Sequence, residues 1–128
     1  MESMKAILLI SHGSRSPKSR QENCDLAARL QQLSGAPISE AAFLEADRPS
    51  IPEGVERCAA AGATEILVLL NFLNSGKHVL TDIPALLEEA RRRHPRIEFR
   101  VTPPIGTHPR IGELFLEWVQ DASMRPQP

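Results

Sequence analysis

The sequence predicts an α/β domain in which four parallel strands alternate with four helices. Three observations support this prediction. Short apolar runs alternate with longer segments of helical periodicity along the 128 residues, which is the pattern of repeated strand–helix–strand units. The run from Ala6 to Ile10 contains no polar residue, as expected of a strand buried on both faces of a parallel sheet. Turn-forming residues then follow each strand. We therefore expect one doubly wound domain over residues 1–128, with strand order 2-1-3-4 and helices on both faces.

The four predicted strands differ in pattern. The first and third are almost wholly apolar. The second contains more polar residues, so its strand pattern is weaker, and the carboxylate residue Glu45 follows it directly. The fourth alternates apolar and polar residues, which is typical of a half-exposed strand at a sheet edge. The strands are predicted at residues 6–10, 38–44, 64–72 and 97–101.

The predicted helices have clear boundaries. Leucines at helical spacing indicate a first helix over residues 18–33, which Ser34 and Gly35 end. The second begins with Ser50 as N-cap and Glu53 three residues later, the pattern of a capping box. Its predicted buried stripe is Ile51, Val55, Cys58 and Ala59, and the third helix, capped by Thr81 or Asp82, turns Ile83, Leu86, Leu87 and Ala90 inward.

A fourth helix begins near His108 and Pro109. Its apolar residues recur at the spacing of one helix face, and residues from about 123 onward are expected to fray. The apolar residues are Ile111, Leu114, Phe115, Trp118 and Val119.

Composition excludes several classes of function. The chain has 15 basic and 16 acidic residues, so no overall basic field points to nucleic acid. The longest apolar stretch, Ile66 to Leu70, is far shorter than the ~20 residues of a membrane helix, and we expect no targeting peptide. Cys24 and Cys58 lie far apart inside predicted helices. We interpret them as packed thiols, which suits a cytoplasmic location.

Polar side chains that carry chemistry follow three of the strands. His12 follows the first strand, Glu45 the second, and His78 the loop after the third. Since parallel strands end at one sheet edge, these three residues should converge where open α/β sheets bind ligands. Either histidine taken singly would more often have a structural role, such as a hydrogen bond to the backbone, than a catalytic one. Two histidines and a carboxylate are what a borderline divalent metal binds and what proton abstraction needs near neutral pH.

The other two histidines, His94 and His108, are weaker candidates. His94 lies at a helix end beside Pro95, where a capping role is favoured. His108, after the fourth strand, could line the same edge as an accessory residue.

Ser11-His12-Gly13 resembles the Arg-His-Gly motif of histidine phosphatases, but Ser11 stands in place of the arginine. A histidine phosphatase is therefore a minor alternative.

A set of spaced motifs covers nearly the whole chain. Residues 8–15 read Leu-Leu-Ile-Ser-His-Gly-Ser-Arg, and 43–51 hold Phe-Leu-Glu and Pro-Ser-Ile. Residues 72–84 hold Phe-Leu, Gly-Lys-His-Val and Asp-Ile-Pro, and 104–107 read Pro-Ile-Gly-Thr. Together these motifs resemble the CbiX/SirB family of class II tetrapyrrole chelatases. Leu70-Asn71 and Asn74 depart from the family pattern and put pocket shape and metal preference in question.

The resemblance implies ATP-independent insertion of Co²⁺ or Fe²⁺, with Ni²⁺ as a third candidate, into sirohydrochlorin on the path to cobalamin or sirohaem. The metal is then a substrate, and no permanently bound cofactor is expected. His12 and His78 match the two active-site histidines, and Glu45 the glutamate that assists them. All three are candidate metal ligands. The short form of the family pairs as a homodimer, so a homodimer is expected here. A non-catalytic metal or tetrapyrrole carrier is the alternative function.

Five further residues are candidates for holding the substrate. Sirohydrochlorin is a polycarboxylate, so the cations Arg15, Lys18 and Lys77 could bind its periphery. Ser14 and Gly76 lie beside them in the same loops, and the Ser14 hydroxyl either contacts substrate or shapes the turn. Exposed loop cations without a ligand are the simpler alternative.

Overall fold

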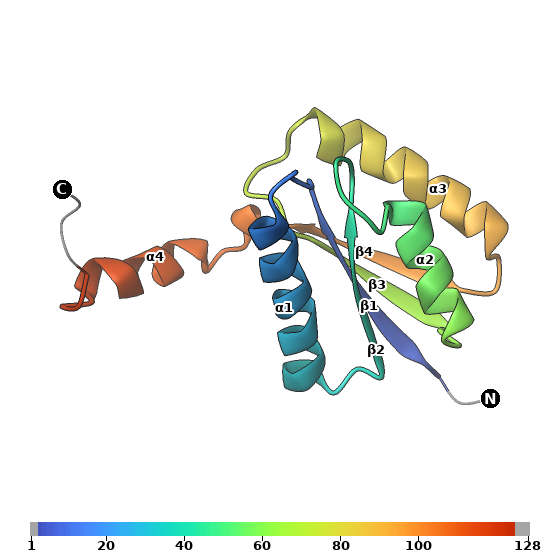
Figure 1. The fold of residues 1–128 in the computed structure, drawn as a ribbon, viewed down its shortest axis with the longest axis horizontal. Helices are drawn as coiled ribbons and strands as arrows, with labels where there is room; N and C mark the ends of the chain where they lie inside the picture. Colours follow the sequence, from blue (N-terminus) through green and yellow to red (C-terminus); the bar gives the residue numbers. More distant parts are fainter. Residues whose placement is uncertain (1–2, 125–128) are drawn as a thin grey trace.

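The computed structural model describes residues 3–124, without the side chains of His78 and Leu80. In this range four parallel strands form one sheet in the order β2-β1-β3-β4, which confirms the predicted order (Figure 1). Residues 125–128 of the predicted frayed tail lie outside the described range. The elements are β1 (Lys5–Ser11), α1 (Pro17–Ser34), β2 (Ile38–Phe43), α2 (Ile51–Ala60), β3 (Glu65–Leu70), the π-helical turn η1 (His78–Asp82), α3 (Ile83–Arg93), β4 (Glu98–Pro104), the 3₁₀ turn η2 (Ile105–Thr107) and α4 (Ile111–Gln120).

The strand positions follow from their sequence patterns. β1 pairs with both β2 and β3, and every residue from Ala6 to Ser11 is buried, as expected of a central strand. β4 pairs only with β3 and lies at the edge, as its alternating pattern predicts. It continues to Pro104, beyond the predicted end at Val101. Proline is tolerated there because one side of an edge strand needs no ladder hydrogen bonds.

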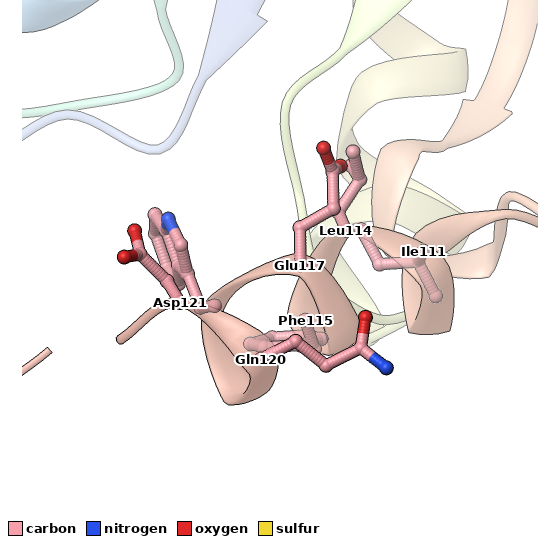
Figure 2. Close-up of a pocket in the computed structure, with 7 residues that line it drawn as sticks. Ile111, Leu114, Phe115, Glu117, Gln120 and Asp121 are labelled. Carbon is pink, nitrogen blue, oxygen red and sulfur yellow. The ribbon is translucent and has the colours of Figure 1, made fainter. Parts of the chain in front are cut away.

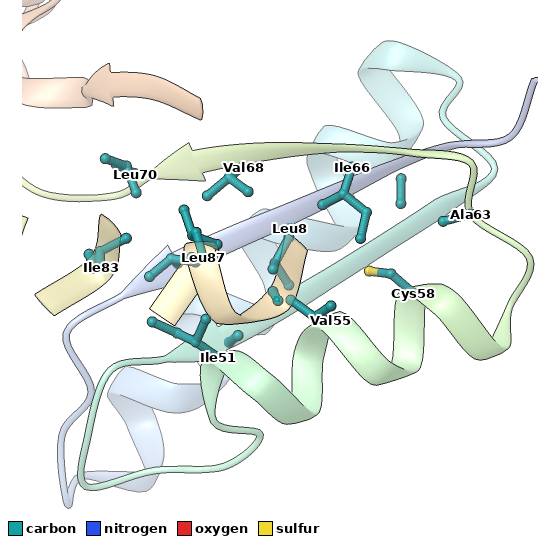
Figure 3. Close-up of a cluster of buried hydrophobic side chains, with 14 of the residues drawn as sticks. Leu8, Ile51, Val55, Cys58, Ala63, Ile66, Val68, Leu70, Ile83 and Leu87 are labelled. Atoms are coloured by element: carbon teal, nitrogen blue, oxygen red, sulfur yellow. The ribbon is translucent and has the colours of Figure 1, made fainter. Parts of the chain in front are cut away.

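One face of the sheet packs against α2 and α3. Figure 3 shows this core, in which α2 and α3 side chains meet the apolar residues of β1 and β3. The approach of α2 is close: a Cβ atom on Gly54 would lie 2.8 Å from Cβ of Ala42 and 2.9 Å from Cδ1 of Leu8. The fully buried residues of this core include Leu8, Ile10, Ile51, Val55, Cys58, Ile66, Val68, Ile83 and Leu87.

The predicted capping box at the start of α2 is confirmed. Ser50 Oγ accepts from the Glu53 N–H at 3.2 Å, and Glu53 Oε1 accepts from the Ser50 N–H at 2.9 Å. Arg48 pairs with the same carboxylate, and these bonds lower the pKa of Glu53 to about 2. Asp82 occupies the predicted N-cap position of α3, but the expected capping bond is absent. Asp82 has helical dihedral angles and makes no capping bond, because η1 already leads the chain into α3.

The opposite face of the sheet is only partly covered. Helices lie on both faces, as predicted, but on this side α1 packs mainly against β1 and β2, and Leu69 of β3 touches only its margin. α4 projects away from the sheet and covers neither face (Figure 1). Its amphipathic stripe is therefore exposed. No helix among the described residues is both long and apolar enough to cross a bilayer.

Candidate active site

His12 and Glu45 meet at the carboxyl edge of the sheet. Parallel pairing of β1 and β2 ends at Ser11 opposite Phe43, and two backbone hydrogen bonds continue it into the loops. The Leu44 N–H donates to Ser11 O at 2.9 Å, and the Glu45 N–H donates to His12 O at 3.0 Å. His12 Nε2 consequently lies 2.9 Å from Glu45 Oε1, with the two side chains 48% and 57% exposed. This half of the predicted convergence is present, and solvent or a ligand can reach it.

Gly13 allows the two loops to approach so closely. Its φ of +104° is in the left-handed region that favours glycine. A Cβ atom at this position would lie 1.7 Å from the carbonyl oxygen of Glu45. No other residue fits between the loops. The His-Gly pair in the sequence therefore reflects backbone contact with the segment that carries the carboxylate.

His78 lies at the first residue of η1, after the loop that follows β3. That loop leaves the same end of the sheet as the loops after β1 and β2 (Figure 1). The side chain of His78 is outside the described part of the structure. Among the side chains that are described, no group of three or more His, Cys, Asp or Glu residues could hold a metal. The three-residue metal site stays a prediction.

The predicted substrate-binding residues lie in loops at this edge. Arg15, Lys18, Gly76 and Lys77 are exposed, the first two around the start of α1 and the last two just before η1. Ser14 Oγ accepts from the N–H of Ser16 at 3.1 Å. Ser14 thus helps to shape the turn into α1, whereas substrate contact by any of these residues stays a prediction.

A polar cluster beneath His12 was missed by the sequence reasoning. Ser11 Oγ donates to Asn23 Oδ1 at 2.9 Å, and the Asn71 side-chain N–H donates both to that oxygen, at 2.8 Å, and to Ser11 Oγ, at 3.1 Å. Asn23 in turn donates to the Ser19 carbonyl at 3.0 Å. These bonds hold the ends of β1 and β3 against α1. The available signal was the polar residue that ends each apolar run, Ser11 and Asn71.

The other two histidines have structural partners. His94 Nε2 lies 2.8 Å from Glu56 Oε1, which joins α3 to α2 and lowers the pKa of Glu56. His94 also occupies the C-cap position of α3, as predicted. His108 Nδ1 accepts from the Arg110 N–H at 3.0 Å in the turn before α4. The accessory role considered for His108 stays a prediction.

A hollow of about 780 Å³ lies away from this edge. All the residues that line it belong to α4 or directly follow it, as Figure 2 shows, and they include Leu114, Phe115 and Trp118. Because no second element closes it, the hollow is one side of the projecting helix and not a cleft. The site at His12 and Glu45 is an open edge.

The fold and this edge define a doubly wound α/β protein with a histidine–carboxylate pair where β1 and β2 end. Such a fold serves many unrelated chemistries, so we compared the chain with known proteins. The pattern of the CbiX family matches residues 6–122. The chain therefore belongs to the CbiX family, which confirms the resemblance and excludes the histidine phosphatases as its family.

Named relatives and a solved structure agree with this assignment. The chain is 29% identical to a sirohydrochlorin cobaltochelatase of Priestia megaterium, over 93% of this chain and 39% of the relative. It is 30% identical to a sirohydrochlorin ferrochelatase of the same organism, over 94% of this chain and 46% of the relative. The sirohydrochlorin chelatase SirB of Bacillus subtilis subspecies spizizenii, in complex with cobalt, superposes with a TM-score of 0.82 at 33% identity, covering 92% and 50% of the two chains. The chain thus spans about half the length of these relatives or less.

Proposed function

We propose that the protein inserts a divalent metal ion, Co²⁺ or Fe²⁺, into a sirohydrochlorin-type tetrapyrrole without ATP. The observation that carries the proposal is the exposed contact of His12 Nε2 with Glu45 Oε1, at 2.9 Å, on the carboxyl edge of a CbiX-family sheet. Relatives named as cobalto- and ferrochelatases support both metals. Imidazole and carboxylate donors suit either ion.

Metal insertion requires a base and a transient metal ligand. The incoming ion must lose water, and two pyrrole protons must leave the macrocycle. An ionised carboxylate only accepts hydrogen bonds, so contact with Glu45 Oε1 assigns the proton of neutral His12 to Nε2. We assign Nδ1, the acceptor nitrogen of that tautomer, as the ring atom that binds the metal ion or the proton during insertion. Glu45 orients the ring and can pass protons to solvent through its exposed oxygen atoms.

The proposal assigns roles to the remaining predicted residues. His78 supplies the second imidazole, from the loop after β3. Arg15, Lys18 and Lys77 bind the peripheral carboxylates of the substrate, since exposed cations around a rim attract and orient a polyanion. Ser14 and Gly76 shape the two loops that carry these cations.

We further propose that the chain works as a single chelatase-like domain over residues 1–128, that two copies pair as a homodimer, and that the protein is cytoplasmic. Pairing is supported by the size of the macrocycle, which is large relative to the open edge of one small domain, so a second copy would complete a cleft around it. Cys24 and Cys58 are free thiols, which agrees with a reducing compartment.

The test is metal insertion into sirohydrochlorin, followed by absorbance with Co²⁺, Fe²⁺ or Ni²⁺. His12→Ala and His78→Ala should each lose most of the rate. His94→Ala is the matched control because that histidine pairs with Glu56 between α2 and α3. Near-normal rates in both edge variants would remove the proposal. Binding of metal or tetrapyrrole with no rate above the spontaneous reaction would instead identify a carrier.

A further inference from the structure

α4 exposes a large apolar surface. The exposed fractions are 57% for Leu114 and Phe115, 65% for Trp118 and 79% for Val119. At ~150–250 Å² for a large side chain, these residues together present on the order of 500 Å² of apolar area. That is near the upper end for the largest apolar patch on a soluble monomer, and such patches are commonly interaction sites.

The same chain leaves an apolar groove open beside α1. The groove has a volume of about 520 Å³ and is lined by Leu26 and Leu30 of α1, Leu69 of β3, Thr102 of β4 and Ile105 of η2. It exists because α1, about 10 Å wide, covers only two strands that are spaced ~4.8 Å apart. On β3 the burial pattern alternates accordingly: residues facing α2 and α3 are buried, and those facing the groove are half-exposed.

The segment between β4 and α4, which includes η2, directs α4 away from the groove of the same chain. The Gly106 N–H donates to Phe72 O at 2.9 Å, and a Cβ atom on Gly106 would lie 1.8 Å from Leu73 O. Thr107 Oγ1 donates to Pro104 O at 2.8 Å. These contacts fix η2 against the loop after β3, and α4 leaves it pointing outward (Figure 1). To enter the groove of its own chain, α4 would have to reverse within the short segment at Pro109.

We propose that α4 of each protomer docks in the groove of a second copy, so that the homodimer forms by reciprocal exchange of this helix. The exposed face of α4 and the groove are both apolar, and each chain has one of each. Two chains related by a two-fold axis can therefore cover both helices and both grooves, which leaves no docking surface open for a third copy. Two helices in two grooves would remove on the order of 2,000 Å² of surface, which is the size of a specific interface. The grooves begin at Ile105 and His108, next to the start of α4, so the exchanged surfaces are continuous.

The exchange also reaches the candidate active site. Asn71 lines the groove, and its amide donates to Ser11, the residue before His12. A helix in the groove therefore packs against the cluster that fixes the end of β1. The inference rests on the proposed pairing of two copies, but it does not depend on chelatase activity.

The first test is the mass of the protein in solution by sedimentation equilibrium. Wild type should be a dimer, and Phe115→Asp and Trp118→Asp should each raise the dimer dissociation constant about 1,000-fold, since a hot-spot loss of ~30-fold occurs twice per dimer. Ala60→Asp is the matched control, because Ala60 is exposed at the end of α2, which packs on the face of the sheet opposite the groove. Far-UV circular dichroism checks that each variant folds. A wild-type monomer would overturn both the pairing and the exchange.

The second test asks which surfaces meet. Tagged Trp118→Cys and untagged Leu26→Cys copies, both carrying Cys24→Ser, are mixed and oxidised. Cys58 is buried with its pKa raised to about 12 and will not compete. A disulfide between the two kinds of copy is expected, and Ala60→Cys in place of Leu26→Cys should form none, because Ala60 is exposed on α2, across the sheet from the groove. A dimer that survives Trp118→Asp, or shows no such disulfide, would overturn the exchange while leaving the homodimer in place.

Discussion

Substitution of Gly13 by alanine tests the geometry that brings His12 to Glu45. The alanine Cβ would have to share space with the Glu45 carbonyl oxygen, 1.7 Å away, and backbone on both sides leaves no flexible atom to move aside. The loop after β1 must therefore separate from the loop after β2. We expect the His12–Glu45 contact to be lost in a protein that still folds.

The magnitude follows from comparison with Gly62. Gly62 has a similar φ, +97° against +104°, but no atom lies within 4 Å of its Cβ position. Gly62→Ala then measures only the left-handed backbone, about 1–2 kcal/mol. Gly13→Ala adds an overpacking term of about 1–3 kcal/mol. The difference between the two variants should thus be about 2 kcal/mol.

Urea unfolding of both variants provides the assay, with metal insertion measured alongside. Gly13→Ala should lower the unfolding free energy by more than Gly62→Ala and should reduce metal insertion, whereas Gly62→Ala should leave metal insertion intact. Equal stability losses within ~0.5 kcal/mol would show that the two loops are not in the contact described, and the reasoning about the site would fail.

Three further predictions concern packing, the polar cluster and pH. Gly54→Ala should destabilise by about 1 kcal/mol in urea unfolding, because close packing under α2 outweighs the gain in helix propensity; Gly112→Ala, with no atom within 4 Å, should cost nothing. Asn71→Leu should lose about 1–3 kcal/mol of thermal or urea stability by removing bonds to Ser11 and Asn23, and an unchanged midpoint would contradict this. The pKa of Glu53 is lowered to about 2, so its stabilisation is present above the unfolded-state pKa and is lost as pH falls from about 5 towards 2. In a urea series across that range, Glu53→Gln should lose less stability than wild type, and parallel curves would count against the capping box.

Local patterns in the sequence were sufficient for most of the fold. The capping box at Ser50 and the glycine stop at Gly35 depend only on residues within a few positions, and both are present. The alternation of elements does not fix the strand order, but 2-1-3-4 was predicted as the most economical doubly wound arrangement, and it is the order observed. Helix α3 begins at Ile83, directly after Asp82, as predicted. The turn η1 before it was not predicted, and the Asp82 capping bond is absent because the conformation of Asp82 depends on how the preceding loop enters α3.

Half of the candidate site was also predictable. His12 and Glu45 could be paired because both follow strands that end at one edge, and parallel register then brings them together. The cluster of Ser11, Asn23 and Asn71 could not, since Asn23 lies on a helix face and nothing local indicates that it turns towards two strand ends.

The amino-acid sequence by itself determined the elements, their order along the chain and the edge at which His12 meets Glu45, because these depend on periodicity, turn residues and strand direction. Only the tertiary structure decided where α4 goes. The amphipathic pattern of α4 predicts that its apolar face is buried, but it does not predict which surface covers that face. An apolar helix face packs equally well against its own sheet or against the sheet of a second copy. The anchored turn at Gly106 sends the helix outward and leaves the groove beside α1 open.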